Sequence, residues 1–306
     1  MTKFSGHESF ACRYAWLPKA YRELTADPDA FAEEDRAMVR LGVGKNMVRS
    51  IRFWVEVMGV AVPTAGRSFE LTPFGRAVLA EDGFDPYLED ARTLWLLHWN
   101  ISTYKDPLFA WQFLLFSWPF GELTRSEALA ALRREAQRLN AIHSDVTLGI
   151  HLDVFLHTYI PPRTTKVTAE QSLDSPLAEL ELLHQVGERR ADGSGRREPS
   201  YAFRRESKPE VTKAVFEYCL DDYWRRHKKS DATITFRDAA MAPFSVGQVF
   251  KLPEDDVRSR LDAYVLTDSA APFRYQPSAV QGLIFRRDHG VHDFLAAVYA
   301  QEADCA

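Results

Sequence analysis

The residues best suited to catalysis stand near the N-terminus, in the segment GHESFACR. His7 and Glu8 are adjacent and Arg13 follows within two helical turns, so a histidine, a carboxylate and a guanidinium lie close together in sequence. Gly6 permits another group to approach the backbone closely. A structural alternative explains the same residues equally well, because Glu8 and Arg13 could pair and fix the N-terminal segment against the core.

A second candidate site lies in the acidic segment DPYLEDARTLWLLHW. If a helix begins by Pro86, Asp85 and Glu89 share one face, and these carboxylates with His98 could hold Mg²⁺ or Mn²⁺ for phosphodiester hydrolysis. The structural alternative is ordinary capping by acidic residues in the first turn, with His98 as a hydrogen-bonded core residue. Neither a PD…ExK nor an HNH nuclease pattern is visible in the sequence. The catalytic candidates are His7, Glu8, Arg13, Glu89 and His98.

The glycines of LGVGKN raise the question of a nucleotide-binding loop. A P-loop requires a glycine five positions before its Gly-Lys pair and a Ser or Thr after the lysine, because that hydroxyl holds the magnesium ion. Val39 stands where the first glycine belongs, and Asn46 follows the lysine. We therefore expect no bound nucleotide.

The same stretch is better explained as a surface that contacts a phosphate backbone. Lys45, Arg49 and Arg52 are spaced so that they share one face of a helix, and this face would be free to meet DNA. The other face carries apolar residues at the same spacing, Ile51, Val55 and Met58. From residue 36 to residue 76 there are seven basic residues and two acidic ones, a local net charge of +5 in a chain of net charge -5. Such an island predicts salt-dependent binding to double-stranded DNA.

The elements that must position these residues follow one another in a familiar order. The pattern predicts a helix over residues 33–41, a turn at 42–44 and a helix over 46–58, and then two short strands in VAVPT and RSFELT. A further helix should begin at Thr72, whose hydroxyl can cap it ahead of Pro73. This is the order of a winged helix-turn-helix, with Arg67 at the tip of the wing as a fourth DNA-binding candidate.

The rest of the chain is predicted to be mainly helical. The apolar run 107–120 is too short to span a membrane and predicts a buried helix, and further helices are expected over 126–139 and 144–159. A polar stretch at 161–175 marks a boundary, and two later segments each suggest a helix followed by a hairpin: SPLAELELLHQVG with PSYAFRR, and TITFRDAAM onward.

These elements define a mainly α fold with small β-hairpins, of the α+β class. We predict an N-terminal segment with a winged helix-turn-helix over residues 1–80, a helical core over 81–160 and a winged-helix-like region over 161–306. Two further basic stretches, RRADGSGRRE and WRRHKKS, are more typical of a solvated loop and of the basic end of a helix.

The composition excludes several other classes of protein. A hydrophobic fraction of 46% and a charged fraction of 26% are those of an ordinary globular protein. Three widely spaced cysteines suggest neither a disulfide framework nor a zinc site, which favours a reducing, cytoplasmic setting. The N-terminus lacks the features of a signal peptide, and no membrane association is expected.

Several long stretches resemble a bacterial family catalogued as a domain of unknown function, which includes the SspB-type component of DNA phosphorothioation defence systems. The resemblance covers nearly the whole chain. The stretches that carry it are FSGHESFACRYAWLPKAY, LGVGKNMVRSIRFW, LTPFGRAVLAEDGFDPYLEDARTLWLLHW, DSPLAELELL and SVGQVFKL.

The resemblance implies partners and an activity. The partners would be a cysteine desulfurase, an ATPase and an ATP-pyrophosphatase-like enzyme, which together replace a non-bridging phosphate oxygen with sulfur. The implied activity is nicking of one DNA strand, but the resemblance assigns no catalytic residue. Two hypotheses therefore stand, a strand-nicking component and a non-enzymatic winged-helix adaptor or regulator. Either is compatible with a homodimer.

Overall fold

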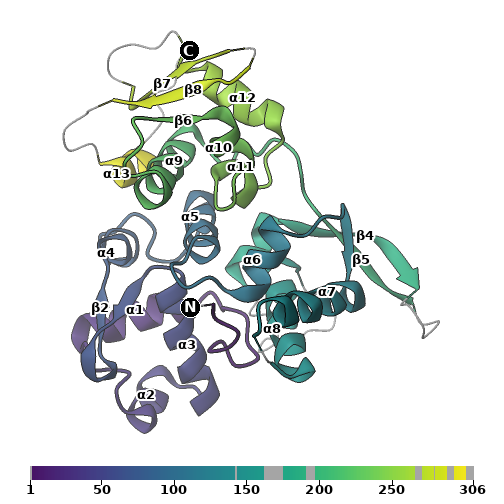
Figure 1. The fold of residues 1–306 in the computed structure, drawn as a ribbon. Helices are drawn as coiled ribbons and strands as arrows, with labels where there is room; N and C mark the ends of the chain where they lie inside the picture. The colour runs from purple at the N-terminus through teal and green to yellow at the C-terminus, as the bar shows by residue number, and fades with distance from the viewer. Residues whose placement is uncertain are drawn as a thin grey trace. The chain divides into compact units, whose positions relative to one another are not determined.

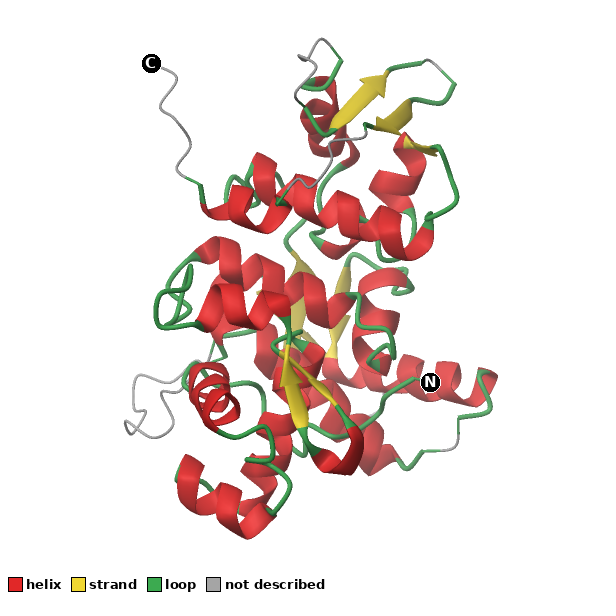
Figure 2. Cartoon of the chain, turned by 90° about the vertical axis from the view of Figure 1, so that its left-hand side faces the viewer, coloured by secondary structure: helices red, strands yellow, loops and turns green. Residues whose placement is uncertain are grey.

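The computed structural model describes residues 2–141, 143–161, 175–190, 197–265, 271–278, 280–287 and 293–300. The chain forms two compact units, Met1–Arg204 and Arg205–Ala306 (Figure 1). Both are α+β, and Figure 2 shows short strands among predominant helices. Within the described ranges, no helix is long and apolar enough to cross a membrane.

The first unit begins with helices that carry the candidate residues. They are α1 (Trp16–Ala26), α2 (Glu34–Leu41), α3 (Lys45–Val57) and α4 (Pro73–Leu79), with the hairpin β1 (Ala61–Pro63) and β2 (Phe69–Leu71) between the last two. Gly42 ends α2 in the left-handed conformation with φ of 66°, which glycine adopts without strain. Gly44 is the extended residue before α3, and the Thr72 hydroxyl caps α4. The predicted order of helix, turn, helix, hairpin and helix is confirmed.

A second group of helices forms the apolar centre of this unit. It consists of α5 (Ala91–Ser102), α6 (Phe109–Phe116) and α8 (Asp145–Tyr159), which are buried along most of their length. Trp95, Trp99 and Trp111 are fully buried there. The predicted buried helix in the apolar run is therefore confirmed, because its large side chains are withdrawn from water.

A three-stranded antiparallel sheet completes the first unit. It is formed by β3 (Glu122–Thr124), β4 (Leu183–Arg190) and β5 (Arg197–Phe203) in the order β3-β5-β4, with α7 (Arg125–Arg138) following β3 directly. The helix predicted in SPLAELELLHQVG is wrong, because the segment forms the short 3₁₀ helix η2 (Pro176–Leu180) and then β4. Pairing of Leu183 with Phe203 on β5 overrides the local helical preference.

The second unit repeats part of this layout. It contains α9 (Lys213–His227), β6 (Thr233–Thr235), α10 (Phe236–Met241), α11 (Val246–Val249), α12 (Glu254–Asp262), β7 (Phe273–Gln276), β8 (Leu283–Arg286) and α13 (Phe294–Tyr299). The sheet order is β6-β8-β7. In both units a short strand before the helices pairs with the second strand of a later hairpin. The basic end predicted in WRRHKKS is confirmed as the last turn of α9, where Arg225 and Arg226 pair with acidic residues of the same helix.

Candidate functional site

The exposed face of α3 holds two of the predicted DNA-binding residues beside one carboxylate. Arg49 donates from Nε and Nη2 to the two oxygens of Glu34, at 2.8 and 3.3 Å, and Lys45 Nζ lies 2.9 Å from the same carboxylate. These hydrogen bonds, first from Arg49 and then from Lys45, lower the pKa of Glu34 to about 2. The turn at Gly42 brings Glu34 of α2 against α3, so a carboxylate occupies a place where three N–H donors converge.

Arg52 lies further along the same helix and is half-buried. Its guanidinium lies over the ring of Phe69, 5.8 Å from the ring centre, and burial lowers its pKa. Arg67 is exposed at the tip of the hairpin, in the 3₁₀ turn η1 (Ala65–Arg67), and its charge also lowers the pKa of Arg52. Neither arginine forms an ion pair with any described residue, so both charges are available to a ligand.

A groove of about 1020 Å³ runs beside this face. Arg49 and Arg52 line one side, and Lys3, Gly6 and Glu8 of the N-terminal segment line another. The remaining walls come from the hairpin and from the segment between α7 and α8. The sequence motifs GHES and GKNMVRSIR are therefore parts of one surface.

The basic island is more fully compensated than the sequence suggests. Arg36 and Arg40 pair with Asp27, and Arg40 also pairs with Glu23. The local charge of +5 was counted over residues 36–76, and these acidic partners and Glu34 all lie before residue 36, outside that count. Within residues 36–76, the arginines without an ion partner among the described residues are therefore Arg52 and Arg67 of this surface and the exposed Arg76 of α4.

His7, a predicted catalytic residue, lies between two residues that line the groove, Gly6 and Glu8, but is itself buried and paired with His151 of α8. The two rings are stacked, and His7 Nε2 lies 2.7 Å from His151 Nδ1. His7 Nδ1 lies 2.9 Å from the carbonyl oxygen of Glu8, which can only accept, so His7 carries its proton on Nδ1. His7 Nε2 then accepts from His151 Nδ1–H. The Ser50 hydroxyl of α3 donates to the His7 carbonyl, which ties the segment to the basic helix.

Burial keeps this histidine pair neutral. It lowers the pKa of His7 to about 4, and it holds the pKa of His151 well below its usual value, with the charges of His7 and His143 adding to the effect. Both ring nitrogens of His7 are engaged, so its role in this arrangement is to fix the N-terminal segment. One sequence signal marks His151, namely its place between Leu148 and Leu152 on the buried face of a helix, but nothing in the spacing indicates that it pairs with His7.

Glu8 and Arg13 are not brought together. Glu8 lines the groove, with φ of 53°, while the Arg13 guanidinium lies over the ring of Trp16 at 5.4 Å. No ion pair joins the two residues in the described structure, so the structural alternative, in which Glu8 pairs with Arg13, is wrong.

The acidic segment before α5 has a structural role. Asp85 is buried and accepts from the backbone N–H groups of Glu89 and Asp90, and Asp90 caps α5. The helix begins at Ala91, so the expected shared helical face of Asp85 and Glu89 is not formed. The intervening residues instead fold into a turn around the Asp85 carboxylate.

His98 is a hydrogen-bonded core residue, as the structural alternative predicted. Its Nδ1 lies 2.8 Å from the hydroxyl of Tyr159, which also accepts from Trp111. The five catalytic candidates thus fall in separate surroundings. Only His7 and Glu8 adjoin the groove.

Metal binding was the chemistry expected of these carboxylates and histidines. In the part of the chain that the structure describes, no three His, Cys, Asp or Glu side chains are grouped so that they could hold a metal ion. Asp85, Glu89 and His98, the residues considered for Mg²⁺ or Mn²⁺, therefore do not form such a group.

Comparison with known proteins identifies the family. The family described as "Protein of unknown function (DUF4007)" matches residues 4–299. The "Magnesium ion-bound SspB crystal structure" has a TM-score of 0.78 at 27% identity, covering 94% of this chain and 83% of that chain. The "SspB crystal structure" has a TM-score of 0.77 at 26% identity, covering 94% and 84%. No curated protein sequence matches the chain. The chain belongs to the DUF4007 family and resembles SspB over nearly its whole length.

Proposed function

We propose that this protein is the DNA-binding component of a bacterial DNA phosphorothioation defence system. The observation that carries the proposal is the surface made by α3 and the β1–β2 hairpin, where Arg49 and Arg52 line a groove and Arg67 stands at the hairpin tip. Family membership and the likeness to SspB support the placement in such a system.

The fold of this surface supports a winged helix-turn-helix. In such a module the second helix contacts DNA and the hairpin contacts the adjacent backbone. Here α2 and α3 would be the two helices and the β1–β2 hairpin the wing. The sheet orders β3-β5-β4 and β6-β8-β7 support two further winged-helix-like modules.

The contact between Glu34 and α3 suggests how a DNA phosphate would bind. A phosphate oxygen accepts from Lys and Arg as a carboxylate does, and it would take the place of Glu34 beside Lys45 and Arg49. Breaking the ion pairs of Glu34 with Lys45 and Arg49 costs free energy and opposes DNA binding. Arg52 and Arg67 have no ion partner among the described residues, so they carry no such cost. Affinity is expected to fall steeply with salt, because bound phosphates release their counterions.

The binding assay uses duplex DNA and fluorescence anisotropy at several salt concentrations. A triple variant with alanine at Arg49, Arg52 and Arg67 should bind DNA more weakly, by about 1 kcal/mol or more for each residue replaced. The slope of log affinity against log salt concentration should also become shallower, by about one for each lost phosphate contact. Arg22→Ala is the matched control, since Arg22 is exposed on α1 and does not line the groove. Equal affinity of the triple variant and the control would reject this surface.

Strand nicking is the activity proposed from the resemblance to the SspB-type family, together with the expected cysteine desulfurase, ATPase and ATP-pyrophosphatase-like partners. Glu8, which lines the groove, is the best placed of the catalytic candidates.

A non-enzymatic adaptor is the second candidate function, and the separation of the catalytic candidates favours it. Incubation with supercoiled plasmid and Mg²⁺ or Mn²⁺ distinguishes the two. A nickase converts the plasmid to open circles, and Glu8→Gln should reduce that conversion. An adaptor binds the plasmid and leaves it supercoiled.

A further inference from the structure

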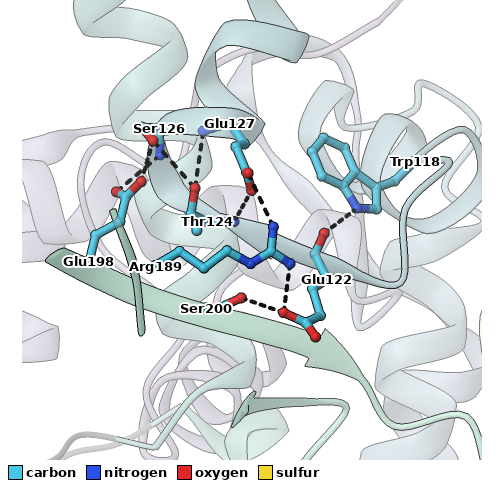
Figure 3. Close-up of polar contacts among 8 residues, drawn as sticks. All are labelled: Trp118, Glu122, Thr124, Ser126, Glu127, Arg189, Glu198 and Ser200. Carbon is cyan, nitrogen blue, oxygen red and sulfur yellow. Dashed lines mark hydrogen bonds and ion pairs between the residues drawn. The ribbon is translucent and has the colours of Figure 1, made fainter. Parts of the chain in front are cut away.

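A cavity of about 600 Å³ lies in the first unit beside the segment that joins α6 to β3. Phe120 stands on its rim and is 63% exposed, an unusual position for so large an apolar ring. Trp118 backs it edge-on, with ring centres 5.4 Å apart, and is itself buried. The Trp118 indole donates to the Glu122 carbonyl and so fixes the segment, as Figure 3 shows. One aromatic face is thus held open to solvent.

The polar wall of the cavity is built from a fixed cluster. Arg189 of β4 donates to the carboxylates of Glu122 and Glu127, at 2.6 and 3.2 Å, and the Ser200 hydroxyl donates to the same Glu122 oxygen (Figure 3). Glu127 also accepts from the Thr124 backbone N–H. The pKa of Glu122 is lowered first by Arg189 and then by Ser200, so this carboxylate is ionised at neutral pH.

Two groups in this wall remain available to a ligand. All hydrogen bonds to the Glu122 carboxylate from described residues end on Oε2, which leaves Oε1 as an acceptor. Arg134 of α7 lines the cavity and has no ion partner among the described residues. The cavity therefore offers an aromatic face, an anionic acceptor and a cationic donor together.

We propose that this cavity binds an unstacked nucleobase that carries an exocyclic amino group. The base would stack on Phe120, its amino group would donate to Glu122 Oε1, and Arg134 would meet the attached phosphate. Thymine has no such amino group and would bind more weakly. The two arginines and two carboxylates of the cavity balance in charge, which favours a base over a bare phosphate. The base could belong to a free nucleotide or to an unpaired position in a strand.

The test measures binding of the full chain to deoxynucleoside monophosphates and to short single strands of one base each. The Phe120→Ala variant should bind adenine, cytosine and guanine probes about 10-fold more weakly, and Phe120→Trp should restore affinity. Tyr87→Ala is the matched control, because Tyr87 is a 71% exposed aromatic residue elsewhere in the same unit. Arg134→Ala should weaken binding of the monophosphates and leave the affinity for the corresponding deoxynucleosides, measured alongside them, unchanged.

Each outcome decides the inference. Binding of monophosphates alone identifies a free nucleotide as the ligand, and binding of strands alone identifies an unpaired base. Equal affinity of wild type and Phe120→Ala for all probes, or tighter binding of thymine than of the other bases, would overturn the proposal. The affinity for blunt duplex DNA is measured in parallel. It should fall on substitution of the α3 arginines and stay unchanged in Phe120→Ala. Failure of the base-binding cavity can therefore be told apart from failure of the α3 surface.

Discussion

The His7–His151 pair predicts a pH dependence of stability. Burial lowers the pKa of His7 from 6.5 to about 4, so the unfolded chain binds more protons than the folded chain between these pH values. The stabilisation is complete above the unfolded pKa and is lost as the pH falls toward the folded pKa. A shift of this size corresponds to about 3 kcal/mol in total, of which about 2 kcal/mol is lost by pH 5. The lowered pKa of His151 acts in the same direction.

The measurement is urea denaturation at several pH values, followed by tryptophan fluorescence. All tryptophans except Trp224 lie in the first unit, so the signal reports the unit that holds the pair. The His7→Gln variant should be less stable near neutral pH and should lose about 2 kcal/mol less than wild type on acidification to pH 5. His184→Gln is the control, because His184 is exposed on β4.

Carboxylates with lowered pKa values also destabilise the folded chain in acid, but they do so equally in wild type and variant. The difference between the two pH profiles therefore isolates the histidine pair. Parallel profiles for wild type and His7→Gln would refute the reasoning, since they would show that His7 is not held neutral by burial.

Three further predictions follow from the same structure. Glu34→Gln should tighten duplex DNA binding at low salt, measured by anisotropy, because the carboxylate no longer competes with phosphate; weaker binding would contradict this. Gly75→Ala should lower the free energy of unfolding by about 2 kcal/mol or more in denaturant melts, because its Cβ would lie 2.2 Å from a backbone carbonyl oxygen. Gly44→Ala is the control and should lower the free energy of unfolding by about 1 kcal/mol or less, because the space around Gly44 is open. Tyr159→Phe should cost about 1–3 kcal/mol by the same assay, because it removes a buried hydroxyl that bonds two side chains; an unchanged midpoint would contradict that role.

Local signals were sufficient for most helices of the first unit. The spacing of apolar residues placed α3 within one residue at each end, and the glycines before it marked the turn. Thr72 caps the helix for which it was proposed. Such features depend on neighbours a few residues away, so the sequence displays them directly.

The failures depend on partners far along the chain. Leu183 joins a strand because β5 pairs with it, and no local pattern reveals that pairing. The compensation of α3 by Glu34 and the burial of His7 against His151 are likewise tertiary contacts. The candidate site could therefore be predicted as a basic helical face, but not as a groove lined by an N-terminal segment that a histidine pair holds in place.

The contact between His7 and His151 also has a consequence for the order in which the protein is made. The two residues are 144 positions apart, so during synthesis the N-terminal segment has no partner ring until α8 has left the ribosome. Helix α3 leaves the ribosome much earlier, but the N-terminal segment that lines its groove gains this histidine partner only when α8 arrives. A nascent chain or a fragment that ends before α8 would thus carry the basic helix without the finished groove.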